Sequence, residues 1–405
     1  MRNLLSIMLM AGVVGGCTVG PEQEGPKTPP TTPVENCKVT AVEKLPSTFE
    51  NVVISPVTGL SYSSMQNPDP AEKCNTFLGR TDPNCIYQLY SLDSTMQATC
   101  LSCTQVPGGP DPRLHKVMLS MHPTGQWIFV GVEQPDHEHQ WMPWDWQLGI
   151  IQSGGWINMW ATTPAGDRWY RLTDLGPNKA GSGYIGPSIS PDGATLVWTE
   201  LQNTGWDALK YPGGVWKLWR ADLVVNPLTG APELNSRIDI TPSGAHWLEP
   251  GNFAPDGTHM LLSTDIGLPD GQGVWGQDQW SIDVFTGELQ NLTQTPTAWD
   301  EHGLYSADGK KVVFMSSYPF MNWPVNPNTY LNLRTEFMLI NSDGSGLQQL
   351  THFNESGYPE FQGGGNVVAA VAGFTAPDTL FGTVMGENFS KTNWRIQFNG
   401  PCGSQ

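Results

Sequence analysis

One short motif recurs along the 405-residue chain and constrains its fold more than any other feature. Its clearest copy is PSISPDGATLVW, which runs from Pro187 to Trp198. Proline presets the backbone for a turn, aspartate can hydrogen-bond its own backbone, and glycine accepts a positive φ without a steric penalty. Short apolar runs flank the turn on both sides, as in two paired strands. The motif therefore predicts a β-hairpin.

Six copies of this hairpin follow one another at a similar spacing. Their last turn glycines are Gly59, Gly125, Gly193, Gly257, Gly309 and Gly365. A second pair of strands follows each hairpin and tends to end in Leu-Thr, as at Thr173, Thr293 and Thr351. Four strands per repeat, at a period above ~40 residues, are typical of propeller blades. We predict an all-β fold, a six-bladed β-propeller with four-stranded antiparallel blades.

The six repeats use nearly all of the chain, so its length does not require a second folded domain. We place the propeller at residues 37–405. The expected blades are Phe49–Cys103, His115–Thr173, Tyr184–Thr241, Glu249–Thr293, His302–Thr351 and Tyr358–Phe398. In the last blade, TLFGTVMG and NWRIQF are the expected outer strands.

Residues 1–16 have the layout of a signal peptide, with Arg2 before an apolar stretch and small residues before Cys17. This small-residue run resembles the lipobox of bacterial lipoproteins, which implies cleavage before Cys17 and lipidation of its thiol. Thr18 then implies the outer membrane, or the cell surface, of a Gram-negative bacterium. The alternative is an ordinary signal peptide. Residues 17–36 are rich in Pro and Thr, and we expect a disordered tether.

Acidic residues outnumber basic ones, 38 to 20, which gives a formal net charge of −18. Such a surface repels phosphate backbones, so we do not expect nucleic acid as a partner. Divalent cations and neutral ligands are accommodated more easily. We expect a monomer that meets the membrane only through its lipid.

Six cysteines remain besides Cys17, and an even number in an oxidising compartment indicates disulfides. Their positions in the sequence favour three pairs: Cys37–Cys402 where the first and last blades close the ring, Cys74–Cys85 across one loop, and Cys100–Cys103 across a turn. The alternative for the last pair is a redox or metal motif, although it lacks a second CxxC and the βαβ context of a thioredoxin-like site.

The repeat, SPDG before an apolar strand and then a strand pair that ends in Leu-Thr, resembles the TolB-like β-propeller repeat. The resemblance covers roughly Phe49 to Phe398 and is strongest at Ile189, Phe253 and Tyr305. Proteins with this repeat include translocation scaffolds, peptidase propellers and oligogalacturonate lyases, so it implies the fold and leaves the function open. The chain has no GxSxG motif, and GSGYIG at Gly181 leads into a strand rather than a helix.

Long connections between the second and third strands indicate which end of the ring carries function. Residues just before each first strand should line the channel mouth at that end. The candidates are His115, Tyr184, His246, Glu249, Glu301, His302, Tyr358 and Glu360. Histidines and carboxylates that converge can bind a divalent metal or act as acid and base, and His115, His246 and His302 are the metal candidates. The alternative is a set of hydrogen-bonded channel residues without a ligand.

The blade 2 loop DHEHQWMPWDW, which begins at Asp136, is unusually rich in histidine and tryptophan. A sugar or a peptide could stack on these rings, or they could simply cover the neighbouring blade. The residues are His137, His139, Trp141, Trp144 and Trp146.

Two functions follow from these patterns. The leading interpretation is a non-enzymatic, lipid-anchored envelope propeller that binds a protein, a peptide or a glycan through its long-loop face. The alternative is a metal-assisted polysaccharide lyase or another glycan-active enzyme, which the resemblance to oligogalacturonate lyases implies. A divalent metal is the one cofactor that the channel residues suggest.

Overall fold

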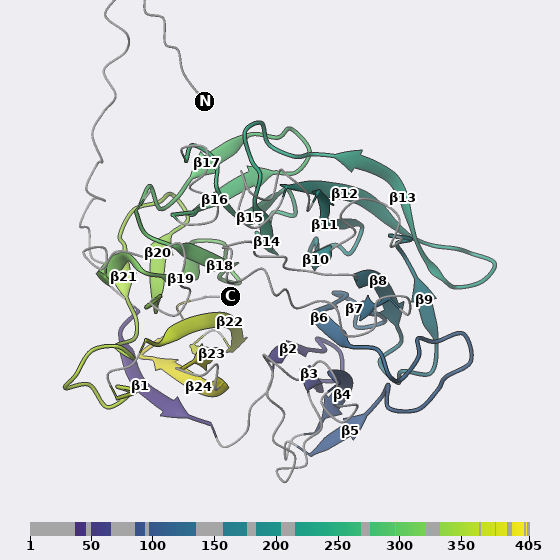
Figure 1. The fold of residues 1–405 in the computed structure, drawn as a ribbon, viewed down its shortest axis with the longest axis horizontal. Coiled ribbons are helices and arrows are strands. Elements are labelled where there is room, and N and C mark those ends of the chain that lie inside the picture. Colours follow the sequence, from purple (N-terminus) through teal and green to yellow (C-terminus); the bar gives the residue numbers. More distant parts are fainter. Residues whose placement is uncertain are drawn as a thin grey trace, which may run out of the picture.

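The computed structural model is a ring of six four-stranded antiparallel sheets, and the predicted six-bladed propeller is thereby confirmed (Figure 1). It describes residues 37–45, 50–65, 86–93, 97–134, 157–175, 184–203, 215–268, 276–295, 297–320, 333–363, 366–376, 378–386, 391–400 and 402. Within these residues, the only helical element is the short 3-10 turn η3 (Tyr318–Phe320), and no helix is long and apolar enough to cross a membrane.

Five blades are each built from four consecutive strands. Blade 1 holds β2 (Glu50–Ile54), β3 (Ser61–Met65), β4 (Gln88–Leu92) and β5 (Ala98–Cys100). Blade 2 holds β6 (Lys116–Met121), β7 (Ile128–Glu133), β8 (Ile157–Thr162) and β9 (Trp169–Arg171). Blade 3 holds β10 (Tyr184–Ile189), β11 (Thr195–Asn203), β12 (Val215–Val225) and β13 (Pro232–Asp239). Blade 4 holds β14 (Leu248–Phe253), β15 (His259–Thr264), β16 (Asp278–Asp283) and β17 (Leu289–Asn291). Blade 5 holds β18 (Asp300–Tyr305), β19 (Lys311–Ser316), β20 (Glu336–Asn341) and β21 (Gln348–Gln349).

Blade 6 is assembled from both ends of the chain. It holds β22 (Val368–Ala376), β23 (Thr379–Met385) and β24 (Lys391–Phe398), and its outermost strand is β1 (Val39–Lys44). Figure 1 shows this purple strand against the yellow ones. β1 pairs antiparallel with β24 from Val39 opposite Phe398 to Lys44 opposite Trp394. The expected blade 6, confined to Tyr358–Phe398, is therefore wrong in two respects. Its fourth strand comes from the N-terminal part of the chain, and its hairpin turns between β22 and β23 rather than at Gly365, which precedes β22.

A covalent bond lies beside this closure. Cys37 is joined to Cys402, with their Cα atoms 5.2 Å apart, and both residues are buried. The backbone N–H of Asn399 also donates to the carbonyl of Lys38. A second disulfide joins Cys100 to Cys103 at the outer edge of blade 1. The expected pair Cys74–Cys85 lies outside the described residues.

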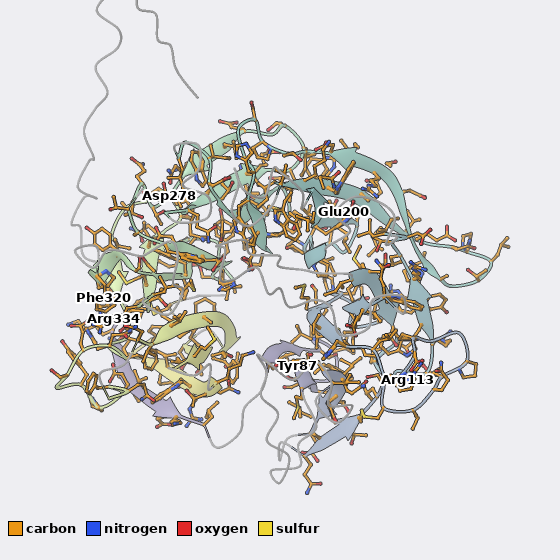
Figure 2. All side chains as sticks on the ribbon, in the orientation of Figure 1. Tyr87, Arg113, Glu200, Asp278, Phe320 and Arg334 are labelled. Atoms are coloured by element: carbon orange, nitrogen blue, oxygen red, sulfur yellow. A yellow bond between two sulfur atoms is a disulfide. The ribbon has the colours of Figure 1, made fainter. Side chains whose placement is uncertain are left out.

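The recurring Leu-Thr has a structural role at the outer edge of five blades. In each of them, a hydroxyl accepts a hydrogen bond from a backbone N–H of the third strand. We call these five residues, Ser102, Thr173, Thr241, Thr293 and Thr351, the Ser/Thr latch. In four blades the hydroxyl also donates to a buried polar side chain at the start of the third strand, and these acceptors are Gln88, Asn158, Asp278 and Glu336. Asp278 is labelled in Figure 2.

The innermost strand of every blade is irregular at the same place. Its pairing with the second strand is interrupted between residues that are three apart, as between Glu301 and Leu304 in β18 and between Pro250 and Phe253 in β14. The other interruptions are Glu50/Val53, Val117/Ser120, Ile185/Ser188 and Ala369/Ala372. A bulge re-aims a side chain that the regular alternation of a strand would send elsewhere. Six bulges therefore surround the axis of the ring.

Candidate functional site

The two ends of the ring differ in how much chain they carry. First and second strands are joined by two to six residues, as from Tyr305 to Lys311. Second and third strands are joined by 11 to 23 residues in blades 1–5, as from Glu133 to Ile157. Because the strands of a blade alternate in direction, all of these longer connections leave from the end at which the innermost strands begin. We call this end the long-loop face, and only short stretches of those connections fall within the described residues.

Three side chains converge near this face on the seam between blades 4 and 5. Glu249 lies on β14, and Glu301 and His302 lie on β18. The Nε2 atom of His302 is 3.1 Å from Oε1 of Glu249, and one ligand atom from each of the three residues lies within 4.8 Å of the others. The side chains of His302 and Glu249 are 23% and 19% exposed, so solvent reaches the cluster, whereas Glu301 is buried.

The bulge in β18 explains how neighbouring residues come to share one site. Successive side chains of a regular strand point to opposite faces. His302, however, has φ of +58°, a left-handed conformation that is uncommon for a residue with a side chain. The conformation turns His302 toward Glu249 of the preceding blade, although Glu301 directly precedes it.

The charges of the cluster are strongly coupled. Burial and the negative charge of Glu249 raise the pKa of Glu301 to about 8. Burial alone would lower the pKa of His302, but Glu249 and Glu301 together raise it to about 9. Burial likewise acts to raise the pKa of Glu249, yet the charge and hydrogen bond of His302 outweigh it and hold that pKa below its ordinary value. These shifts favour an ionised Glu249 next to a charged His302, and they favour the protonated form of Glu301.

Two further residues surround Glu301. The indole Nε1 of Trp299 donates to Oε2 of Glu301 at 3.0 Å. Gln277 is fully buried just before β16, and its backbone carbonyl accepts from the N–H of Asp300. The side-chain amide of Gln277 lies close enough to Glu301 to oppose the rise in the pKa of Glu301. Neither the oxygen nor the nitrogen of this amide makes a hydrogen bond of normal geometry. The sequence reasoning did not single out Gln277.

The other two histidines that were expected at the channel mouth, His115 and His246, do not join the cluster of Glu249, Glu301 and His302. His115 is buried, and its Nδ1 accepts from the backbone N–H of Tyr87 at 3.1 Å. His246 faces Asp265, with Nδ1 and Oδ2 3.4 Å apart. Neither belongs to the one group of three with metal-ligand spacing in the described part of the chain.

Tyr358 and Glu360 lie in the connection between blades 5 and 6, which also belongs to the long-loop face. Tyr358 stacks on His352, with ring centroids 3.6 Å apart and planes 10° apart, and it is 44% exposed. Glu360 is buried and accepts from the backbone N–H of His352 at 3.1 Å. Tyr184 begins β10, and its side chain lies outside the described part of the structure.

Several predicted site residues lie outside the described residues and stay predictions. They are the lipidated Cys17 and the whole His/Trp loop of blade 2, with His137, His139, Trp141, Trp144 and Trp146.

No protein-family model and no curated protein matches the chain. Solved structures that resemble it include TolB from Acinetobacter baumannii, at 15% identity over 78% of this chain with a TM-score of 0.43. The chain spans 60% of that protein. A putative TolB from Agrobacterium tumefaciens matches at 14% identity over 75% of this chain and 87% of its own, with a TM-score of 0.44. A putative gluconolactonase matches at 13% identity over 92% and 98%, with a TM-score of 0.49. Two of these are TolB structures, the family whose repeat the sequence resembles, but the assignment of the fold rests on the strand topology.

Proposed function

We propose that the protein is a binding module of the bacterial cell envelope that holds a partner on its long-loop face, around the channel mouth. The observation that carries the proposal is the difference between the two ends of the ring. Short turns cover one end, while the long connections of five blades and the cluster of Glu249, Glu301 and His302 lie at the other. Binding residues are commonly displayed on loops that a rigid scaffold positions.

Charge favours a protein or peptide partner with a basic segment. The chain carries 18 more acidic than basic residues, and the partly exposed carboxyl group of Glu249 lies at the long-loop face. Opposite charge on a partner speeds its approach and helps to orient it. The exposed ring of Tyr358, held flat against His352, offers a rigid aromatic contact of the kind that dominates many interfaces. A neutral glycan is the other partner that such a ring could hold.

The proposal places the protein outside the cytoplasm. The signal sequence, the lipobox-like run before Cys17 and the tether of residues 17–36 support an outer-membrane lipoprotein with the ring held beyond the lipid. Membrane contact is then limited to the lipid. The acyl chain can be tested directly, by mass spectrometry of the membrane-extracted protein and of a Cys17→Ala variant.

A pair of matched variants tests the binding face. Tyr358 and Phe285 are exposed aromatic residues on opposite ends of the ring, since Phe285 lies in the turn between β16 and β17. Crosslinking pull-downs from the envelope fraction, with peptide and glycan arrays alongside, should recover the same partner with the wild type and with Phe285→Ala. Recovery with Tyr358→Ala should fall by about tenfold, the equivalent of roughly 1.4 kcal/mol. Equal recovery with both variants would contradict the proposal.

One observation favours a second candidate, a glycan-active enzyme. The carboxyl groups of Glu249 and Glu301 have pKa values displaced in opposite directions, which is the arrangement that separates a proton donor from a proton acceptor. In that case Glu301 supplies the proton and Glu249 receives one. Turnover of acidic and neutral oligosaccharides should then be measurable and be lost in Glu301→Gln, whereas the binding module shows no turnover with any of them.

A further inference from the structure

We propose that Glu249, Glu301 and His302, with Gln277 beside them, form a binding site for one divalent transition-metal ion on the seam between blades 4 and 5. The inference does not rest on the partner proposed above, because it concerns side chains of this chain alone. It assigns a ligand to the one described group of three acidic or imidazole side chains whose ligand atoms lie within reach of a single ion.

The spacing of the ligand atoms fits an ion. Two ligands at ~2.0–2.1 Å from a tetrahedral metal lie roughly 3.3 Å from each other. The Nε2 atom of His302 and Oε1 of Glu249 are 3.1 Å apart, and an atom of Glu301 lies within 4.8 Å of both. An ion can therefore take the place of the proton that His302 and Glu249 share, with a small movement of Glu301.

The donor set selects the class of ion. An imidazole nitrogen with two carboxylates suits zinc and its first-row neighbours. Calcium and magnesium take oxygen ligands almost exclusively, so the nitrogen of His302 disfavours both of them. Trp299 holds one oxygen of Glu301, Oε2, by a hydrogen bond of 3.0 Å, which fixes the orientation of the carboxyl group. Hydrogen bonds of this kind orient metal ligands in known sites.

The environment of the Gln277 side chain is a second and independent observation that supports a bound ion. Gln277 is fully buried, and its amide lies close to Glu301, yet neither its Oε1 nor its Nε2 makes a hydrogen bond of normal geometry. Buried polar side chains nearly always have a partner, and ordered water is a common one. A water that completes the coordination of an ion next to Glu301 would give this amide its missing partner. The residue directly before the latch acceptor is Gln277 in blade 4, Ile157 in blade 2 and Thr335 in blade 5, so the fold itself does not require glutamine.

Other histidine–carboxylate pairs in the described ranges lack the third ligand. His259 with Asp256 is such a pair, with Nδ1 and Oδ2 2.7 Å apart in the turn between β14 and β15. His259→Asn is therefore the matched control. It removes an imidazole from a carboxylate at the opposite end of the ring.

The test is Zn²⁺ binding by calorimetry, with metal analysis, on protein first treated with a chelator. The wild type and His259→Asn should each bind one Zn²⁺. Glu301→Gln and His302→Asn should bind at least tenfold more weakly; asparagine also tolerates the positive φ at residue 302. The proposal is overturned if the wild type binds no stoichiometric Zn²⁺, or if both site variants bind it as tightly as the wild type does.

Gln277→Leu separates a metal site from a structural ion pair. The substitution should weaken Zn²⁺ binding about tenfold, while the chelated protein unfolds at the same temperature as the wild type or higher, because an unpaired buried amide is gone. Zn²⁺ should raise the unfolding temperature of the wild type more than that of Gln277→Leu. Unchanged affinity with lower thermal stability would assign Gln277 to the structure alone and remove it from the site. Capture of the partner by Tyr358 is measured separately, so failure of one proposal does not imply failure of the other.

Discussion

Blade 6 fastens its outermost strand differently from the other five blades. In blades 1–5 that strand follows directly in the chain, and a hydroxyl of the Ser/Thr latch bonds its end to the third strand. In blade 6 the outermost strand is β1, which comes from the N-terminal part of the chain. The disulfide Cys37–Cys402 lies beside it. A local repeat can secure its own edge with side chains, but the closing blade has to bring together two distant segments.

The largest effect is expected from opening the closure of blade 6. The disulfide Cys37–Cys402 spans 365 residues, and the chain-entropy model gives such a bond about 6 kcal/mol. The double variant Cys37→Ser/Cys402→Ser should lose stability by up to that amount in urea unfolding. Cys100→Ser/Cys103→Ser removes a bond that spans three residues and should lose about 2 kcal/mol or less. Equal losses would show that the closure adds nothing beyond a local cross-link.

An intermediate loss of stability is expected from removing the latch hydroxyl of blade 4. The Thr293 hydroxyl accepts from the N–H of Gln279 and donates to Asp278. Thr293→Val keeps the shape of the side chain but removes the side-chain acceptor of the Gln279 N–H and one of the hydrogen bonds of Asp278, which costs about 1–3 kcal/mol.

Thr40→Val is the counterpart in blade 6. Thr40 lies on the exposed side of β1, where its hydroxyl donates to the carbonyl of Gln397. Its substitution should change stability by less than about 0.5 kcal/mol in the same urea titration. A loss as large as that of Thr293→Val would mean that hydroxyl groups secure both kinds of edge.

A further effect is a dependence on pH, and it concerns blade 2, one of the latched blades. Lys116 begins β6 and is fully buried, and its Nζ donates to the carbonyls of Asp111 and Leu114. Burial lowers its pKa from 10.5 to about 7. Between these values the unfolded chain binds more protons than the folded one, so stability rises with pH by at most roughly 1.4 kcal/mol per unit.

Lys116→Met should abolish that contribution. Urea midpoints of the variant and the wild type, measured at several values between pH 7 and pH 10, should diverge steadily in favour of the wild type as the pH rises. Parallel curves would show that Lys116 keeps its charge in the folded ring.

Sequence was sufficient for blades 1–5 because each of their hairpins carries its own turn chemistry. Pro191, Asp192 and Gly193 specify one turn regardless of the rest of the chain, and Gly193 has φ of +77°. The Leu-Thr endings were visible as a pattern before their role in the latch was known. The fourth strand of blade 6 was missed because its partner lies more than 350 residues away. One signal was present, since the last repeat ends at Phe398 without a Leu-Thr.

The candidate site was harder to predict, because it depends on register. Glu249, Glu301 and His302 were expected at the channel mouth, but nothing in the sequence shows which of the histidines meets which acid. That is decided by the bulge in β18, which turns His302 toward the preceding blade. Gln277 went unnoticed because it precedes a strand as one ordinary polar residue, and only its burial beside Glu301 sets it apart.

The bond between Cys37 and Cys402 has a mechanical consequence. Cys37 precedes β1 in the chain, so a force applied to the segment before Cys37 reaches its sulfur before it reaches β1. The load then passes through a covalent link to the opposite end of the chain, and the hydrogen bonds between β1 and β24 are spared. A force applied to the ring at Cys37 therefore loads the disulfide and leaves the pairing of β1 with β24 intact.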